Sequence, residues 1–102
     1  GHTHVPFVST SDNWAARANW RVLTQPRESC TADIEEAERL LFNPGSVGQP
    51  RDSVATASYA RFDPQHKRLE VRRLPYDVDT ACDKILAAGL PQLLAERLPL
   101  GY

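Results

Sequence analysis

Hydrophobic and polar residues alternate most clearly in the second half of the chain. Within residues 68–74, Leu69 and Val71 alternate with charged side chains, the period-two pattern of a strand with one buried face. The preceding run at 58–63 has strand composition, and the polar stretch 63–67 joins the two runs. The pattern therefore predicts an antiparallel hairpin.

Shorter apolar runs predict further strands nearer the beginning of the chain. They lie at 5–8, 20–24 and 40–42, and the last of them stops at an Asn-Pro-Gly turn. We expect the first run to end at the polar residues that follow it. The stretch 25–33 is predicted to be an exposed loop, and the acidic stretch 34–39 a helical turn.

The last quarter of the chain changes to the helical period. Asp77 can cap a helix that Gly89 ends, and Pro91 can open a second helix that stops at Pro99. The apolar positions of the first helix follow the spacing i, i+3, i+4, i+7, i+8: Val78, Ala81, Cys82, Ile85 and Leu86. Strands followed by helices predict an α+β fold, with mostly antiparallel strands and two C-terminal helices.

Composition narrows the class of protein. The chain has 102 residues, 41% of them hydrophobic and 25% charged, with a net charge of −1. These values indicate one ordered domain at most, without the positive field that would steer it to nucleic acid or an anionic membrane. Cys30 and Cys82 match no CxxC or zinc-ribbon spacing, so we expect free thiols in a reducing, cytoplasmic compartment.

His2 and His4 are the first candidates for chemistry. On an extended backbone, two imidazoles at i and i+2 point to the same side and can face one metal ion or two adjacent ones. Imidazole suits zinc, iron, nickel and manganese-type sites. The alternative is a solvated chain end, and two histidines cannot complete a site that needs three or four ligands.

The second candidate is the sequence NPGSVGQPR at 43–51. Backbone N–H groups around Gly45, Ser46 and Gly48 can form an anion-binding nest, and Arg51 can bind phosphate in a bidentate manner. The alternative is a rigid turn in which the Asn43 side chain satisfies nearby backbone groups. Neither a P-loop nor a dinucleotide-binding motif occurs.

A basic cluster and a third histidine occupy the predicted hairpin. Lys67, Arg68, Arg72 and Arg73 form the cluster, and His66 precedes it. No aromatic residues are interleaved there, which favours a solvated face over a nucleic-acid patch.

Two motifs in sequence order point to a family. GHTHVPF at 1–7 followed by NPGSVGQPRD at 43–52 resembles the C-terminal part of a calcineurin-like metallophosphoesterase, in the bacterial phosphodiesterase and diadenosine-tetraphosphatase-like branch. The segments ASYARFD at 57–63 and VRRLPYD at 71–77 also resemble that branch. Residues 9–39 remain unmatched and are expected to be an insertion or an enlarged hairpin.

The resemblance implies a fold and a reaction. Residues 1–102 would be the C-terminal portion of a four-layer α/β/β/α sandwich that holds two divalent metal ions, with Mn, Fe, Zn or Ni as candidates. His2 and His4 would be metal ligands, and the loop at 43–51 would support them. The activity implied is hydrolysis of a phosphodiester or phosphomonoester by a metal-activated water, on a phosphorylated small molecule or a nucleotide. The resemblance assigns no catalytic role to any residue of this chain beyond the two metal ligands.

The family's other ligand motifs, DxH, GD and GNH[DE], do not occur in this sequence. Because it also lacks methionine and begins with glycine, we expect a C-terminal piece of a longer enzyme, inactive by itself and partnered by the missing N-terminal part. The competing hypothesis is a non-catalytic fragment or interaction module.

Overall fold

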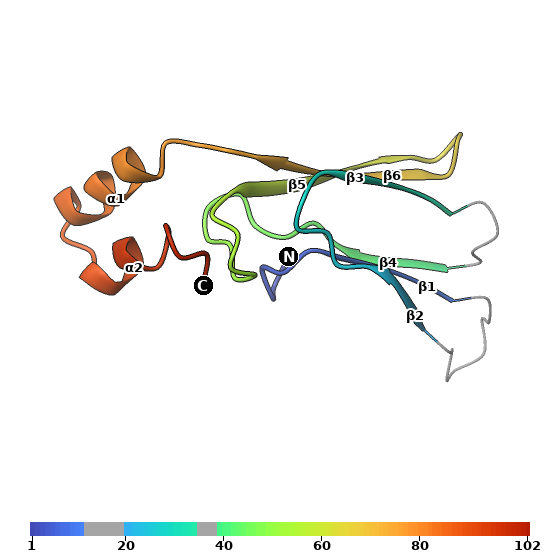
Figure 1. Ribbon diagram of the computed structural model, residues 1–102, viewed down its shortest axis with the longest axis horizontal. Coiled ribbons are helices and arrows are strands. Elements are labelled where there is room, and N and C mark those ends of the chain that lie inside the picture. Colours follow the sequence, from blue (N-terminus) through green and yellow to red (C-terminus); the bar gives the residue numbers. More distant parts are fainter. Residues whose placement is uncertain (12–19, 35–38) are drawn as a thin grey trace.

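The computed structural model describes residues 1–11, 20–34 and 39–102. Strands come first and helices last in this described part (Figure 1). The strands are β1 (Phe7–Ser11), β2 (Arg21–Thr24), β3 (Cys30–Asp33), β4 (Arg39–Asn43), β5 (Ala57–Asp63) and β6 (Arg68–Leu74). The helices are α1 (Val78–Ala87) and α2 (Gln92–Glu96). The predicted α+β class is confirmed.

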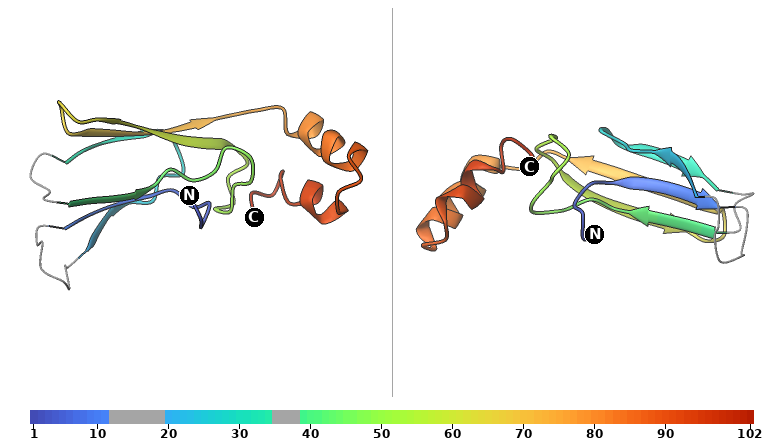
Figure 2. Two further views of the ribbon diagram at one scale, coloured as in Figure 1. Left: turned by 180° about the vertical axis from the view of Figure 1, so that it is seen from behind. Right: turned by 90° about the horizontal axis from the view of Figure 1, so that it is seen from below.

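The strands form two antiparallel sheets that face each other (Figure 1). One has the order β2-β1-β4 and the other the order β3-β6-β5. The two helices lie beyond one end of the sheets, and the two chain ends lie near that same end in all views (Figures 1 and 2). Across the described residues, no helix is long and apolar enough to cross a membrane.

The apolar core lies between the two sheets. Val8 of β1 and both Leu69 and Val71 of β6 are completely buried. Four partly buried residues pack against them: Cys30, Ala32, Leu40 and Ala60. The alternation in residues 68–74 and the hairpin it predicts are therefore confirmed.

The predicted loop at 25–33 is wrong in its second half, because Cys30–Asp33 forms β3. This strand pairs with β6 in the register Cys30 to Val71 and Ala32 to Leu69. Four residues are too few to give a clear alternation, and the partner strand lies far along the sequence. The strand depends on that non-local pairing.

The predicted end of the first strand is also wrong, since β1 continues through Ser11. Its polar residues Ser9, Thr10 and Ser11 are all buried. β1 is the central strand of its sheet and pairs with β2 on one side and β4 on the other. The backbone is therefore hydrogen-bonded on both sides, which overrides the low strand propensity of serine.

The run at 40–42 does form a strand that ends before Pro44, but it is not fully buried. Leu41 and Phe42 remain 48% and 37% exposed, because β4 is an edge strand of the described sheet. The predicted helical turn at 34–39 lies mostly outside the described residues, and Arg39 belongs to β4.

The C-terminal helices begin where the sequence indicates. Asp77 accepts hydrogen bonds from the Thr80 backbone N–H (3.0 Å) and hydroxyl (2.7 Å), which hold the pKa of its carboxyl below the ordinary value. Gly89 has φ of +67°, as expected for a residue that ends a helix. α2 is shorter than predicted. After it the chain folds back toward the segment that precedes β5, where the Gly101 carbonyl accepts a hydrogen bond from the Ser53 N–H (2.8 Å).

Candidate functional site

The segment Gly1–His4 is a tight turn. The His4 backbone N–H donates to the Gly1 carbonyl at 3.2 Å, and His4 has a positive φ of 60°. The extended backbone assumed for the two histidines is therefore wrong, and the alternation argument does not fix their relative direction. His2 is exposed within this turn, whereas His4 is partly buried.

The His4 ring is held by a backbone carbonyl. Its Nδ1 lies 2.7 Å from the Gln49 carbonyl oxygen. A carbonyl only accepts, so Nδ1 carries a proton, and Nε2 is the ring nitrogen that can offer its lone pair to a metal ion. Metal-ligating histidines characteristically donate their other ring N–H in this way, which fixes the tautomer and the ring orientation. The residues present thus fit a metal ligand at His4.

Asn43 connects this turn to the loop at 43–51. Its amide donates to the Thr3 hydroxyl at 2.8 Å, and its carbonyl oxygen accepts the Gly45 N–H at 2.9 Å. A Cβ on Gly1 would lie 2.5 Å from the Asn43 side-chain oxygen, so any larger residue there would displace the Asn43 side chain. The two sequence motifs are therefore packed together, as the resemblance implies.

The loop is a rigid turn that uses its own N–H groups. The Ser46 hydroxyl accepts from the backbone N–H of Gly48 (3.3 Å) and of Gln49 (2.9 Å). With the Gly45 N–H bonded to Asn43, two of the N–H groups proposed for an anion nest, those of Gly45 and Gly48, are already satisfied. The structure favours the rigid-turn interpretation over the nest. An open hollow of about 400 Å³ lies along this loop, with His4 in its wall.

Replacing Gly45 with alanine is expected to lower the free energy of unfolding by about 1–3 kcal/mol. Gly45 has φ of +84°, and a Cβ there would lie 2.8 Å from the Ser58 Cβ. The substitution therefore adds both backbone strain and a steric clash. Urea unfolding of the purified protein measures the effect. Gly48→Ala is the matched control in the same loop, since its Cβ would meet nothing within 4 Å; equal losses for both would refute this account.

A buried ion pair lies behind the loop. The Arg73 guanidinium pairs with the Asp52 carboxylate, and the two side chains are only 4% and 10% exposed. Arg73 also donates to the Pro26 carbonyl at 2.7 Å. Arg73 therefore does not belong to the exposed basic cluster, because it follows Leu69 and Val71 on the inward face of β6.

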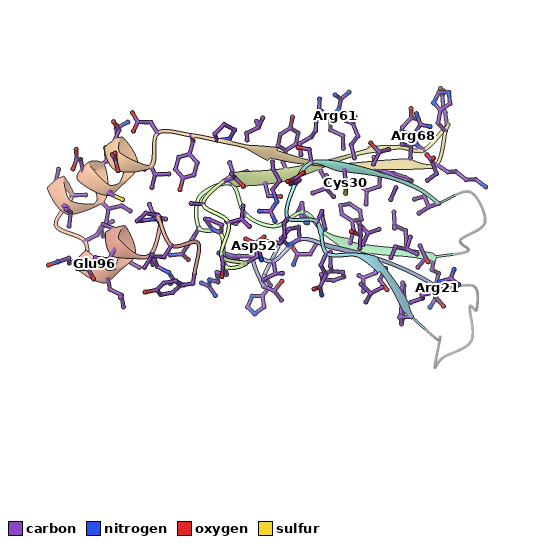
Figure 3. The ribbon with its side chains drawn as sticks, viewed as in Figure 1. Arg21, Cys30, Asp52, Arg61, Arg68 and Glu96 are labelled. Atoms are coloured by element: carbon purple, nitrogen blue, oxygen red, sulfur yellow. The ribbon has the colours of Figure 1, made fainter. Side chains whose placement is uncertain are left out.

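The other basic residues of the hairpin are exposed. Arg68 pairs with Asp33 at 2.8 Å on the outer face of its sheet, where Figure 3 also shows Arg61. His66 lies at the hairpin tip with its Nδ1 2.7 Å from Asp63, and this hydrogen bond lowers the pKa of the Asp63 carboxyl. Both half-buried cysteines, Cys30 and Cys82, are free thiols. Over residues 1–11, 20–34 and 39–102, no three His, Cys, Asp or Glu side chains gather as a metal site.

Comparisons with known proteins agree with the architecture. No family model matches the sequence. An uncharacterized protein of Methanocaldococcus jannaschii is 38% identical over 101 residues, which are 99% of this chain and 37% of that protein. The crystal structure of a metallophosphoesterase from Sphaerobacter thermophilus is 35% identical with a TM-score of 0.84, covering 100% of this chain and 40% of that one.

The chain thus spans 37% and 40% of the lengths of these two relatives. The similarity to the solved structure extends over both sheets and both helices, since it covers the whole chain. The chain therefore has the fold of the corresponding part of a metallophosphoesterase.

Proposed function

We propose that this chain supplies His2 and His4 to the metal centre of a phosphoesterase that hydrolyses phosphodiesters or phosphomonoesters. The observation that carries the proposal is the 2.7 Å hydrogen bond between His4 Nδ1 and the Gln49 carbonyl. It leaves Nε2 as the free ligand atom on a ring that cannot rotate without losing the bond. The structural similarity to a metallophosphoesterase also supports the proposal.

The chain's own residues position the ligand. The turn Gly1–His4 carries both histidines, and Asn43 anchors that turn through Thr3. Gln49 then fixes the protonated nitrogen of His4. Two divalent metal ions, when bound, would neutralise phosphate charge and activate water, and Mn, Fe, Zn and Ni all suit imidazole.

The remaining ligands would come from an N-terminal part of the same protein. The relatives are more than twice as long as this chain, which leaves room for such a part. We further propose a substrate that is a phosphorylated small molecule or a nucleotide, within the bacterial phosphodiesterase and diadenosine-tetraphosphatase-like branch. Free thiols at Cys30 and Cys82 support a cytoplasmic protein.

Metal removal tests the proposal. Protein containing this chain and the upstream sequence, loaded with Mn²⁺, is expected to release p-nitrophenol from p-nitrophenyl phosphate or bis(p-nitrophenyl) phosphate. A chelator should abolish the release, and added Mn²⁺ should restore it. The 102-residue chain assayed alone is expected to be inactive. Metal-loaded protein that hydrolyses neither compound would instead support a non-catalytic interaction module.

A further inference from the structure

A second hollow, of about 290 Å³, lies beside the turn that carries the histidines. Its wall consists of Val5 and Pro6, the segment before β3 that carries Arg27, and the end of the loop with Arg51 and Asp52. Figure 3 places Asp52 between the sheets and the helices. His4 lines the first hollow and the next residue, Val5, lines this one, so the two hollows adjoin the same short segment.

The hollow has a positive balance of charge. Among the described residues that line it, Arg27 and Arg51 are cationic and Asp52 is the one anionic residue. The Asp52 carboxylate already pairs with the buried Arg73, so its charge is compensated from behind. Arg27 and Arg51 are both exposed and face solvent. Planar guanidinium groups are the side chains best suited to bind phosphate in a bidentate manner.

Hydrogen bonds tie both arginines to residues at or just after the end of the loop, and Gln49 links Arg51 to the candidate metal ligand His4. Arg51 donates from Nη2 to the Gln49 side-chain oxygen at 3.0 Å, and the backbone carbonyl of Gln49 holds His4. Arg27 donates from Nη2 to the Ser53 carbonyl at 3.4 Å. Each guanidinium has five N–H donors, so these contacts leave further donors for a ligand.

We propose that Arg27 and Arg51 bind a phosphate group of the substrate that does not react, so that the substrate carries at least two phosphate groups. This inference rests on the proposed function, which assigns the reacting phosphate to the histidine site. The volume lies just below the range of about 300–1,000 Å³ typical of ligand pockets, and it suits a phosphate group with a small substituent.

Calorimetric titration of metal-free protein with inorganic pyrophosphate tests the subsite. Arg27→Met and Arg51→Met, which keep the aliphatic bulk and remove the charge, are each expected to weaken binding about tenfold. Arg61→Met is the matched control, because Arg61 is an exposed arginine on the outer sheet face away from Asp52 (Figure 3). Unchanged affinity in the first two variants would overturn the proposal. An equal loss in the control would also overturn it, by showing a general charge effect.

Pyrophosphate binding and ester hydrolysis are measured separately, so the subsite and the reaction can fail independently. Wild-type protein that binds pyrophosphate through both arginines but hydrolyses no nitrophenyl ester with Mn²⁺ would keep the anion subsite and refute the phosphoesterase. Protein that hydrolyses the esters, but whose pyrophosphate binding does not depend on Arg27 and Arg51, would keep the phosphoesterase and refute the anion subsite.

Discussion

In Mn²⁺-loaded protein that contains this chain and the upstream sequence, replacing His4 with alanine is expected to lower the rate of p-nitrophenyl phosphate hydrolysis by about 100-fold or more. Removal of a partner that merely orients a metal ligand already costs about 10–100-fold in metal affinity or activity, and removal of the ligand itself should cost at least as much. The bound metal content should fall together with the rate. Metal analysis by mass spectrometry on the same preparations measures that content independently of activity.

His66→Ala is the matched control for this substitution. His66 is also a histidine with an oxygen partner on Nδ1, but it lies exposed at the β5–β6 hairpin tip. We expect its metal content and rate to equal those of the wild type. Retention of full metal and activity by the His4 variant would remove His4 from the centre, whatever the effect of the control.

The elements that the sequence predicted correctly depend on local patterns. The alternation of Leu69 and Val71 gave β6, and the capping residue Asp77 gave the start of α1. β3 was not predicted, because its four residues acquire their strand conformation from pairing with β6. The predicted strand end before Ser9 is wrong for a related reason, since β2 and β4 pair with β1 on both sides and satisfy its backbone groups.

The candidate site shows the same division. The residue types in GHTH and NPGSVGQPR identified the two segments, and the resemblance placed them together. The tight turn at Gly1–His4 and the hydrogen bond from His4 to Gln49 depend on non-local packing against Asn43 and Gly45. No spacing rule contains that information.

Arg73 illustrates a further limit of sequence patterns. It stands next to Arg72, and a charged residue is most often exposed, so composition groups the two together. The only local signal is its position two residues after Val71 on the inward face of β6. Recognising it as buried also requires Asp52 as a partner, and that residue belongs to the loop region that ends at β5.

Replacing Asp52 with alanine is expected to lower the free energy of unfolding by about 3–5 kcal/mol, because it leaves the Arg73 charge buried without its carboxylate. Arg73→Met should be comparably costly, since it strands the Asp52 carboxylate. Replacing both, as Asp52→Leu with Arg73→Met, should cost clearly less than the sum of the two single losses. Urea unfolding of the four proteins measures the coupling.

An exposed pair of the same chemistry provides the comparison. Asp33 and Arg68 form an ion pair at 2.8 Å, but their side chains are 59% and 55% exposed. Water screens such a pair, so Asp33→Ala should cost about 1 kcal/mol or less. If the Asp52 and Asp33 substitutions had equal effects, burial would not govern the pair behind the loop. A large difference would instead show that burial makes the Asp52–Arg73 pair important for stability. Asp52 follows Arg51 directly and lines the hollow that contains Arg27 and Arg51, so the same pair stabilises the end of the loop and the wall of that hollow.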